Sequence, residues 1–308
     1  MPGLGPSWRV ALAASLLVCA PGCSIRQTAV NKLGNAMAES SSNFASDDDP
    51  ELVGQAVPFG LKTMEGLVEE NPQDEGLLTA LASGFTQYSY AFVQADAELS
   101  DLSGQLEAAR AGRDRARKLF LRARDYGLRG LEVRHKGLKE ALLAGGDLAR
   151  PLAPLKRQDV PLLYWTASSW ALAISDGKSD MTLVAQLPVA VKMMERALAL
   201  DEAWGEGSLH EFFVSYDATL TEAQGGGPER AREHLERALA LSKGHKLGPR
   251  VAYAEGVLVQ VQDRVQFTRT LEDVLRADAE ADPRYRLANV LAQRRARALL
   301  AHEDDLFL

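Results

Sequence analysis

Four segments of this 308-residue chain can be laid over one another. Each carries apolar residues at positions i, i+3 and i+4 with a glutamate at i+1, and they begin at Met64, Met194, Leu235 and Leu271. Apolar residues at this spacing form one face of an α-helix, and the glutamate is expected on the far, solvent-facing side. Each segment ends in Asn, Asp or Ser, which is typical of a helix that stops before a turn. The pattern therefore predicts repeated amphipathic helices.

The segments between these helices are also helical in period, and no stretch alternates convincingly with period two. We expect partner helices over 74–97, 158–175, 203–222, 249–262 and 283–301. The last three repeated segments are spaced by 41 and 36 residues, close to the roughly 34 residues of a tetratricopeptide repeat. Such helix pairs bury their apolar faces against neighbouring pairs. The predicted fold is all-α, a solenoid of stacked antiparallel helix hairpins with degenerate tetratricopeptide-like repeats. A helical bundle without true repeats is the alternative.

The interval from about 105 to 157 interrupts this regularity. From Arg110 to Lys139 there are 11 Lys and Arg residues against 3 Asp and Glu residues, which predicts a long basic helix. An irregular insertion rich in glycine and proline is expected near 135–157. The basic helix is interpreted as a solvated face, because runs of charge are usually exposed. A docking surface for an acidic partner or for anionic head groups is the alternative.

The N-terminus has the pattern of a lipoprotein signal. Arg9 precedes an apolar run over 10–20 that is too short to cross a bilayer, and Pro21-Gly22-Cys23 follows. A lipoprotein signal peptidase requires a small residue before the cysteine. Acylation of Cys23 would then anchor the protein through its N-terminal lipid alone, because two or three acyl chains hold stably where one does not. An ordinary signal peptide with a fortuitous cysteine is the alternative.

This interpretation sets the expected domain organisation. We predict a lipoprotein signal peptide over 1–22, a lipidated tether of small, polar and acidic residues over 23–50, and a helical repeat domain over 51–308. Ser24 after the cysteine favours the outer membrane over retention at the inner one. The expected location is the periplasmic face of the outer membrane.

Charge and residue usage exclude several classes of function. The formal net charge is −7, whereas a nucleic-acid-binding domain usually has a basic balance. Both cysteines, Cys19 and Cys23, lie near the start, so the body has no cysteine for a disulfide, a zinc site or a nucleophile. No two histidines stand at i and i+4, and the glycines at 225–227 lack the lysine of a phosphate-binding loop. The sequence predicts no catalytic residues, no metal site and no cofactor.

Large aromatic side chains concentrate in three of the expected inner helices. Such rings are candidates to line a cleft for an apolar or amphipathic ligand, and the alternative is that they fill the core. The candidates are Phe85, Tyr88, Tyr164, Trp165, Trp170, Trp204, Phe212 and Tyr216.

Several motifs along the chain resemble the TatT family, which consists of periplasmic lipoproteins associated with tripartite ATP-independent (TRAP) transporters. The motifs that carry the resemblance are Asp48–Val53, Ala56–Glu65, Leu162–Trp165, Met194–Asp201, Gly225-Gly226 and the ending Ala298–Phe307. The resemblance implies a helical solenoid assembled as a homotrimer, with a pore or cleft through each protomer. It also implies a partner, the solute-binding component of a TRAP transporter, and a small hydrophobic ligand. It carries over no catalytic residues.

The expected function is therefore that of a non-catalytic periplasmic lipoprotein. It binds or channels a small, apolar ligand and docks the solute-binding component of a TRAP transporter. The alternative is an outer-membrane tetratricopeptide scaffold that binds an extended peptide during protein assembly.

Overall fold

The computed structural model describes residues 44–308, which are helical and contain no strand. The predicted all-α class is confirmed. The α-helices are α3 (Pro50–Glu70), α4 (Glu75–Tyr88), α5 (Ala95–Leu102), α6 (Leu106–Arg134), α7 (Leu138–Leu143), α8 (Ala149–Leu152), α9 (Val160–Asp176), α10 (Met181–Val184), α11 (Leu187–Leu200), α12 (Ser208–Ala218), α13 (Pro228–Leu241), α14 (Gly248–Tyr253), α15 (Arg264–Arg276), α16 (Arg286–Ala301) and α17 (Glu303–Leu306). The π-helices are η1 (Ser89–Gln94) and η5 (Ala254–Leu258), and the 3₁₀ turns are η2 (Arg157–Asp159), η3 (Trp204–Gly207), η4 (Glu222–Gln224) and η6 (Pro283–Tyr285). The lipidation candidate Cys23, the expected signal peptide and most of the tether lie outside the described residues.

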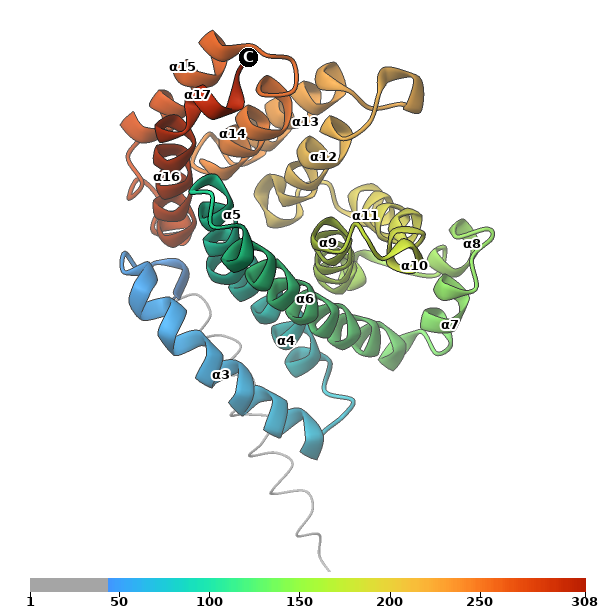
Figure 1. The fold of residues 1–308 in the computed structure, drawn as a ribbon. Helices are drawn as coiled ribbons and strands as arrows, with labels where there is room; N and C mark the ends of the chain where they lie inside the picture. Colours follow the sequence, from blue (N-terminus) through green and yellow to red (C-terminus); the bar gives the residue numbers. More distant parts are fainter. Residues whose placement is uncertain (1–43) are drawn as a thin grey trace, which may run out of the picture.

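The helices pack in the order in which they follow along the chain (Figure 1). α4 lies against α3 and α6, α9 lies between α6 and α11, and α12 contacts α11, α13 and α14. The last described helices return to the first, because α16 also contacts α3. At this contact Arg294 Nη1 lies 2.9 Å from Glu51 Oε1, and Arg286 donates to the carbonyl oxygen of Ser46 at 3.4 Å. The described chain therefore closes on itself.

The four repeated segments form the C-terminal turns of four helices. α3, α11 and α13 end at caps on Asn71, Asp201 and Ser242, as the sequence pattern predicts. α15 ends at Arg276 with its cap on Ala277, one residue before the predicted stop at Asp278. The periodic apolar positions therefore locate the helix ends closely.

One detail of the pattern is wrong at its first occurrence. Glu65 was expected on the solvent-facing side of its helix, but its residue surface is only 8% exposed. Its carboxylate accepts hydrogen bonds from Lys62 and, at 2.8 Å, from the hydroxyl of Tyr126, and Arg122 lies 3.5 Å away. α6 passes over this side of α3 and α4, so an isolated helical wheel misplaces the residue.

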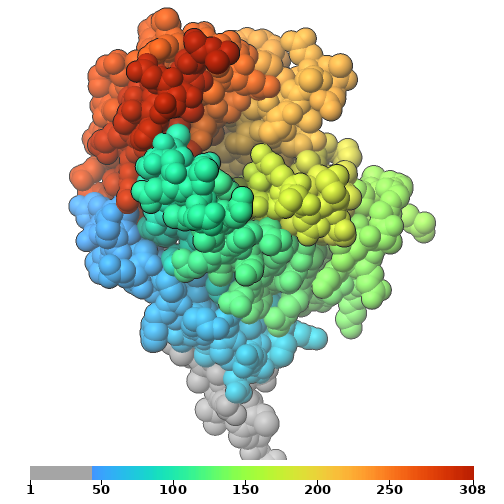
Figure 2. Space-filling view, in the orientation of Figure 1, coloured from blue at the N-terminus to red at the C-terminus, as the bar shows by residue number. Residues whose placement is uncertain are grey.

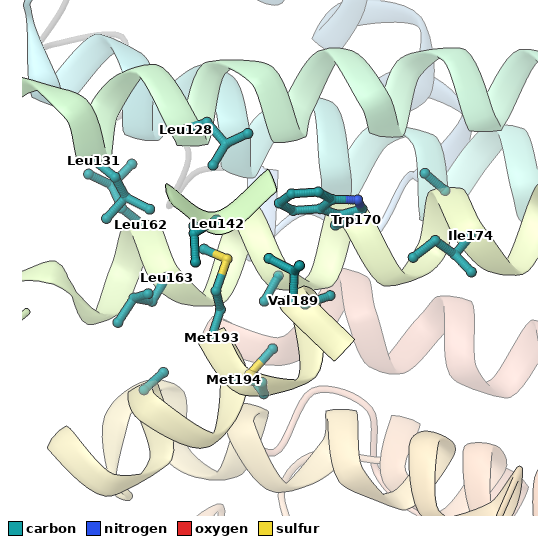
Figure 3. Packing of buried hydrophobic residues seen from close by; sticks show 14 of the residues in the cluster. Leu128, Leu131, Leu142, Leu162, Leu163, Trp170, Ile174, Val189, Met193 and Met194 are labelled. Carbon is teal, nitrogen blue, oxygen red and sulfur yellow. The ribbon is translucent and has the colours of Figure 1, made fainter. Parts of the chain in front are cut away.

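The largest cluster of buried apolar side chains lies between α6, α9 and α11. In Figure 3, Trp170 of α9 lies near Leu128 of α6 and Val189 of α11. The Trp170 side chain is fully buried, its indole N–H donates to Gln186 Oε1 at 2.9 Å, and the Arg124 guanidinium stands 5.1 Å from the ring. This cluster anchors one side of the cavity described below.

A glycine allows α6 and α9 to approach closely. A Cβ atom added at Gly127 would overlap the hydroxyl oxygen of Thr166. Thr166 is fully buried, and its hydroxyl already donates to the carbonyl oxygen of Leu162 at 2.6 Å. The Cβ and Cα atoms of Thr166 would also lie only 3.1 and 3.3 Å from the added atom, so a side chain at this position would force α6 and α9 apart, and glycine permits their close approach.

Two of the predicted partner helices contain a π-helical segment. The expected helix over 74–97 runs from α4 through η1 into α5, and the one over 249–262 runs from α14 into η5. A π segment inserts an extra residue per turn and rotates every later side chain around the helix axis. The sequence period alone does not show these two rotations.

The α-helices of the interval over 135–157 are the short α7 and α8, and the 3₁₀ turn η2 begins at its last residue. The basic helix before it, α6, holds many of its arginines in ion pairs: Arg113 with Asp101 at 3.0 Å, and Arg134 with Glu75 at 2.6 Å and with Asp159 at 3.2 Å. These contacts pair part of the basic charge of α6 with carboxylates of neighbouring segments.

Candidate functional site

The helices surround a cavity of about 1940 Å³ whose lining is mostly apolar. Its wall takes residues from α3, α4, η1, α5, α9, α12, α14, η5 and α16. Figure 2 shows one outer face of the molecule, with a recess between the green residues of α5 and the gold residues of α12 and α13. Because both the first and the last long helices contribute to the wall, the cavity forms only when the whole described fold is assembled.

Three aromatic rings meet on one part of the wall, and we call Tyr164, Trp165 and Trp204 the aromatic triad. Tyr164 and Trp165 come from α9, and Trp204 comes from η3. The centroid of Tyr164 lies 4.8 Å from that of Trp165 and 4.7 Å from that of Trp204, and the two tryptophans are 6.4 Å apart. All three rings are half-buried and line the cavity.

A left-handed turn places Trp204 there. Gly205, Glu206 and Gly207 have φ angles of 62°, 50° and 97°. A Cβ atom at Gly207 would lie 2.7 Å from the carbonyl oxygen of Ala238, so α13 packs directly on this backbone. Glycine adopts such φ angles without the steric cost that other residues carry. The turn ends one helix hairpin and starts α12 at the cavity.

Other predicted aromatic residues also reach the wall. Phe212 and Tyr216 stack on α12 with their centroids 6.1 Å apart, and both line the cavity. Tyr88 of α4 packs on Phe92 of η1 at 5.8 Å and accepts a hydrogen bond from Arg115 at 3.3 Å. Together with the triad, six of the eight aromatic candidates line one cavity.

The remaining two candidates, Phe85 and Trp170, lie in the core and not on the cavity wall. Phe85 is 4% exposed and stacks on Tyr126 at 6.0 Å, while Trp170 is fully buried. Trp170 follows Trp165 by five positions, which is a rotation of about 140° around an α-helix. The two tryptophans therefore leave α9 on nearly opposite sides, one toward the cavity and one toward α6 and α11.

A polar group interrupts the apolar wall, and we call Tyr90, Glu98, Glu255 and Arg295 the polar pole. Arg295 Nη2 lies 3.3 Å from Glu98 Oε2, and the same guanidinium bonds both carboxylate oxygens of Glu255. Tyr90 lies in η1 and Glu255 in η5, so the two π segments present these side chains to the same space. Residues from three regions of the sequence converge here: the adjoining segments η1 and α5, then η5, then α16.

The electrostatics show how enclosed this pole is. Tyr90 is 57% exposed, yet burial and the nearby Glu98 and Glu255 carboxylates raise the pKa of its phenol. Tyr90 is therefore exposed to the space of the cavity while protein surrounds that space, as expected for a side chain in a cavity wall. Burial also raises the pKa of Glu98 to about 7, against the opposing effect of Arg295.

A second ion pair lies beside the triad. Lys246 Nζ is 2.9 Å from Glu211 Oε1, and it also donates to the Ser208 hydroxyl and to the Gly205 carbonyl, each at 2.7 Å. Burial and the Glu211 carboxylate raise the pKa of the Tyr164 phenol, which links this pair to the triad. The Glu211 carboxylate also raises the pKa of Tyr90, so it acts on both the polar pole and the aromatic triad.

The arrangement is suited to binding. The described residues contain no group of three or more His, Cys, Asp or Glu side chains that is able to hold a metal ion. Within residues 44–308, no helix is both long and apolar enough to cross a membrane. What the site offers is a large apolar space, stacked rings and a localised set of charges.

Sequence reasoning missed the polar pole entirely. Tyr90 had a weak signal, since it lies in the aromatic run that also contains Tyr88 and Phe92. Glu98, Glu255 and Arg295 had none, because each lies among other charged residues of amphipathic helices. Only the tertiary arrangement separates these side chains from solvated ones.

Comparison with known proteins gives relatives over nearly the whole chain. The sequence model of the family described as TRAP transporter T-component matches residues 46–307. An uncharacterized protein of Treponema pallidum (strain Nichols) is 32% identical over 311 residues, which cover 96% of this chain and 96% of the relative.

Proposed function

This chain belongs to the TRAP transporter T-component family, and on that premise we propose that it is a non-catalytic accessory protein that binds a small, largely apolar ligand. The family implies a role beside a TRAP transporter. The binding step and the partner are our proposal, in which the protein holds or channels the ligand and docks the transporter's solute-binding component.

The observation that carries the proposal is the cavity of about 1940 Å³ with its mostly apolar lining. Ligand pockets typically combine an apolar, aromatic lining with a few polar groups that fix orientation. Here the triad and the α12 rings supply the aromatic surface, and the polar pole supplies the oriented groups. Filling such a space with the apolar part of a ligand removes apolar surface from water, which favours binding.

The docking part of the proposal rests on the architecture. A set of helices packed in series presents a large, rigid outer surface, which reduces the ordering cost of binding another protein. We propose that these helices are degenerate tetratricopeptide-like hairpins of a solenoid and that the chain assembles as a homotrimer. Acylation at Cys23 would hold the assembly at the periplasmic face of the outer membrane.

Two measurements test the proposed function. Titration of the purified chain with decyl glucoside, an uncharged amphiphile kept below its micelle concentration, is expected to show saturable binding that Trp165→Ala weakens. Affinity purification from the native cell is expected to recover a TRAP solute-binding protein. Saturable binding that Trp165→Ala leaves unchanged would place the ligand elsewhere, and recovery of an outer-membrane assembly factor would favour the scaffold function instead.

A further inference from the structure

The charges at the polar pole and beside the triad do not balance. Tyr90 lies within electrostatic reach of three carboxylates, Glu98, Glu255 and Glu211, and of the Arg295 guanidinium. Lys246 pairs with Glu211. Among these groups three carboxylates face two cations, which leaves one negative charge in surplus at this part of the cavity wall.

Neither cation presents an unused donor to the open space of the cavity. Lys246 uses its three N–H groups on Glu211, Ser208 and the Gly205 carbonyl. Arg295 uses Nε and Nη2 in its ion pairs with Glu255 and Glu98, and its Nη1 atom is buried out of contact with the open space. At this part of the wall, an anionic head group would meet the surplus carboxylate without gaining a hydrogen bond from Lys246 or Arg295.

The neighbouring aromatic triad favours a cation, whereas the polar pole disfavours an anion. Tyr164, Trp165 and Trp204 line one part of the cavity, with ring centroids 4.7 to 6.4 Å apart. The face of an aromatic ring attracts a cation through its quadrupole, and tryptophan does so most strongly. Rings of this kind beside an unbalanced carboxylate are the usual elements of a site for an organic ammonium group.

We propose that the cavity selects an amphipathic ligand with a cationic, ammonium-type head group, held between the polar pole and the aromatic triad while its apolar part fills the remaining space. The proposal rests on the proposed binding function and adds to it the chemical class of the ligand.

The empty and the bound states then differ by a proton. In the empty cavity Glu98 takes up a proton near neutral pH, since burial raises its pKa to about 7, and this proton neutralises the surplus charge. The charged groups that face Glu98 are Arg295 of α16, Glu255 of η5 and Asp176 of α9, with Gln94 of η1 donating to it. A bound cation replaces the proton, so binding of a permanent cation is expected to strengthen by about tenfold between pH 6 and pH 8.

The test compares three decyl compounds that differ only in head group, each below its micelle concentration: decyltrimethylammonium, decyl glucoside and decyl sulfate. Calorimetric titration of the purified full chain at pH 8 is expected to give about tenfold tighter binding of the cation than of the glucoside, and the weakest binding for the sulfate. Glu98→Gln is expected to remove most of the affinity advantage of the cation over the glucoside, together with the pH dependence of cation binding. Glu107→Gln, at an exposed position of α6, is the matched control and should change nothing.

The outcomes separate the two proposals. If none of the three compounds binds, the proposed binding function fails. If the glucoside binds and the cation gains nothing over it, or the sulfate binds most tightly, the binding function stands and the head-group inference is overturned. Should Glu98→Gln not fold, Trp165→Leu provides the second test, since it keeps an apolar side chain and removes a π face. It is expected to reduce the cation-to-glucoside affinity ratio severalfold, and an unchanged ratio would contradict the inference.

Discussion

Two tryptophans on α9 are expected to respond in opposite ways to truncation. Trp170 is fully buried, donates to Gln186 at 2.9 Å and has the Arg124 guanidinium over its ring at 5.1 Å. Trp170→Ala leaves a large cavity in the core and should lower the free energy of unfolding by about 3–5 kcal/mol. For a domain of this size, that corresponds to a fall in Tm of about 6–20 °C.

Trp165 is half-buried and already borders open space, so its truncation removes fewer packing contacts. Trp165→Ala should cost about 1–2 kcal/mol of stability, because much of the ring's surface is not buried in the unliganded fold. The same change removes ligand contact and should weaken decyl glucoside binding by about tenfold, equivalent to about 1.4 kcal/mol.

The assays are thermal unfolding followed by circular dichroism and calorimetric titration of the glucoside, on both variants and on the parent chain. Trp170→Ala measured below its own Tm serves as the control, since it is expected to retain more of the binding than Trp165→Ala. The reasoning is refuted if Trp165→Ala destabilises the protein as much as Trp170→Ala, or if it leaves probe affinity unchanged. Either result would make Trp165 a core residue and remove the aromatic wall from the proposed site.

Three further predictions concern other parts of the molecule. Cys23→Ala should move the protein from the membrane fraction to the soluble fraction with an unchanged Tm, and retention at the membrane would contradict the lipid anchor. Gly127→Ala should destabilise the fold by about 1–3 kcal/mol in chemical denaturation, because its Cβ would overlap the Thr166 hydroxyl between α6 and α9; an unchanged denaturation midpoint would show that the two helices can separate. His210 and His234 face each other through their Nδ1 atoms at 2.7 Å, and burial lowers the pKa of both, to about 4 for His234. A lowered histidine pKa gives stability that is complete above about pH 6.5 and is lost as the pH falls toward 4, by up to about 3 kcal/mol. His234→Gln should therefore reduce the fall in Tm between pH 7 and pH 4. If Tm falls with pH equally in the variant and in the parent chain, this histidine pair is not the source of the pH dependence.

The helical organisation was predictable because its signals are local. Apolar residues at i, i+3 and i+4 fix one face of a helix, and the stops at Asn71, Asp201 and Ser242 are the observed caps. The exception at Glu65 arises from a neighbour more than fifty residues away, Tyr126 of α6, whose hydroxyl bonds the carboxylate. A pattern read along one helix contains no information about which helix will cover its polar side.

The candidate site was predictable only in its composition. The concentration of aromatic residues in three helices predicts which rings are candidates for the site. It does not predict that Trp165 lines the cavity and Trp170 lies in the core, because that depends on how α9 is rotated between its neighbours. The same holds for Tyr90 and Glu255, because the π segments that carry them change the rotation of the helix at those residues.

The sequence by itself determined the helical class, the approximate helix ends and the concentration of large aromatic residues in a few helices. It also determined the resemblance to a transporter-associated family. These properties depend on side-chain spacing within a few residues and on motifs that survive in order along the chain. The tertiary structure alone decided that α16 returns to α3, that six aromatic residues face one cavity, and that Glu98, Glu255 and Arg295 meet there. The physical reason is that burial and charge balance depend on everything surrounding a side chain, and in this protein those surroundings come from helices at opposite ends of the sequence.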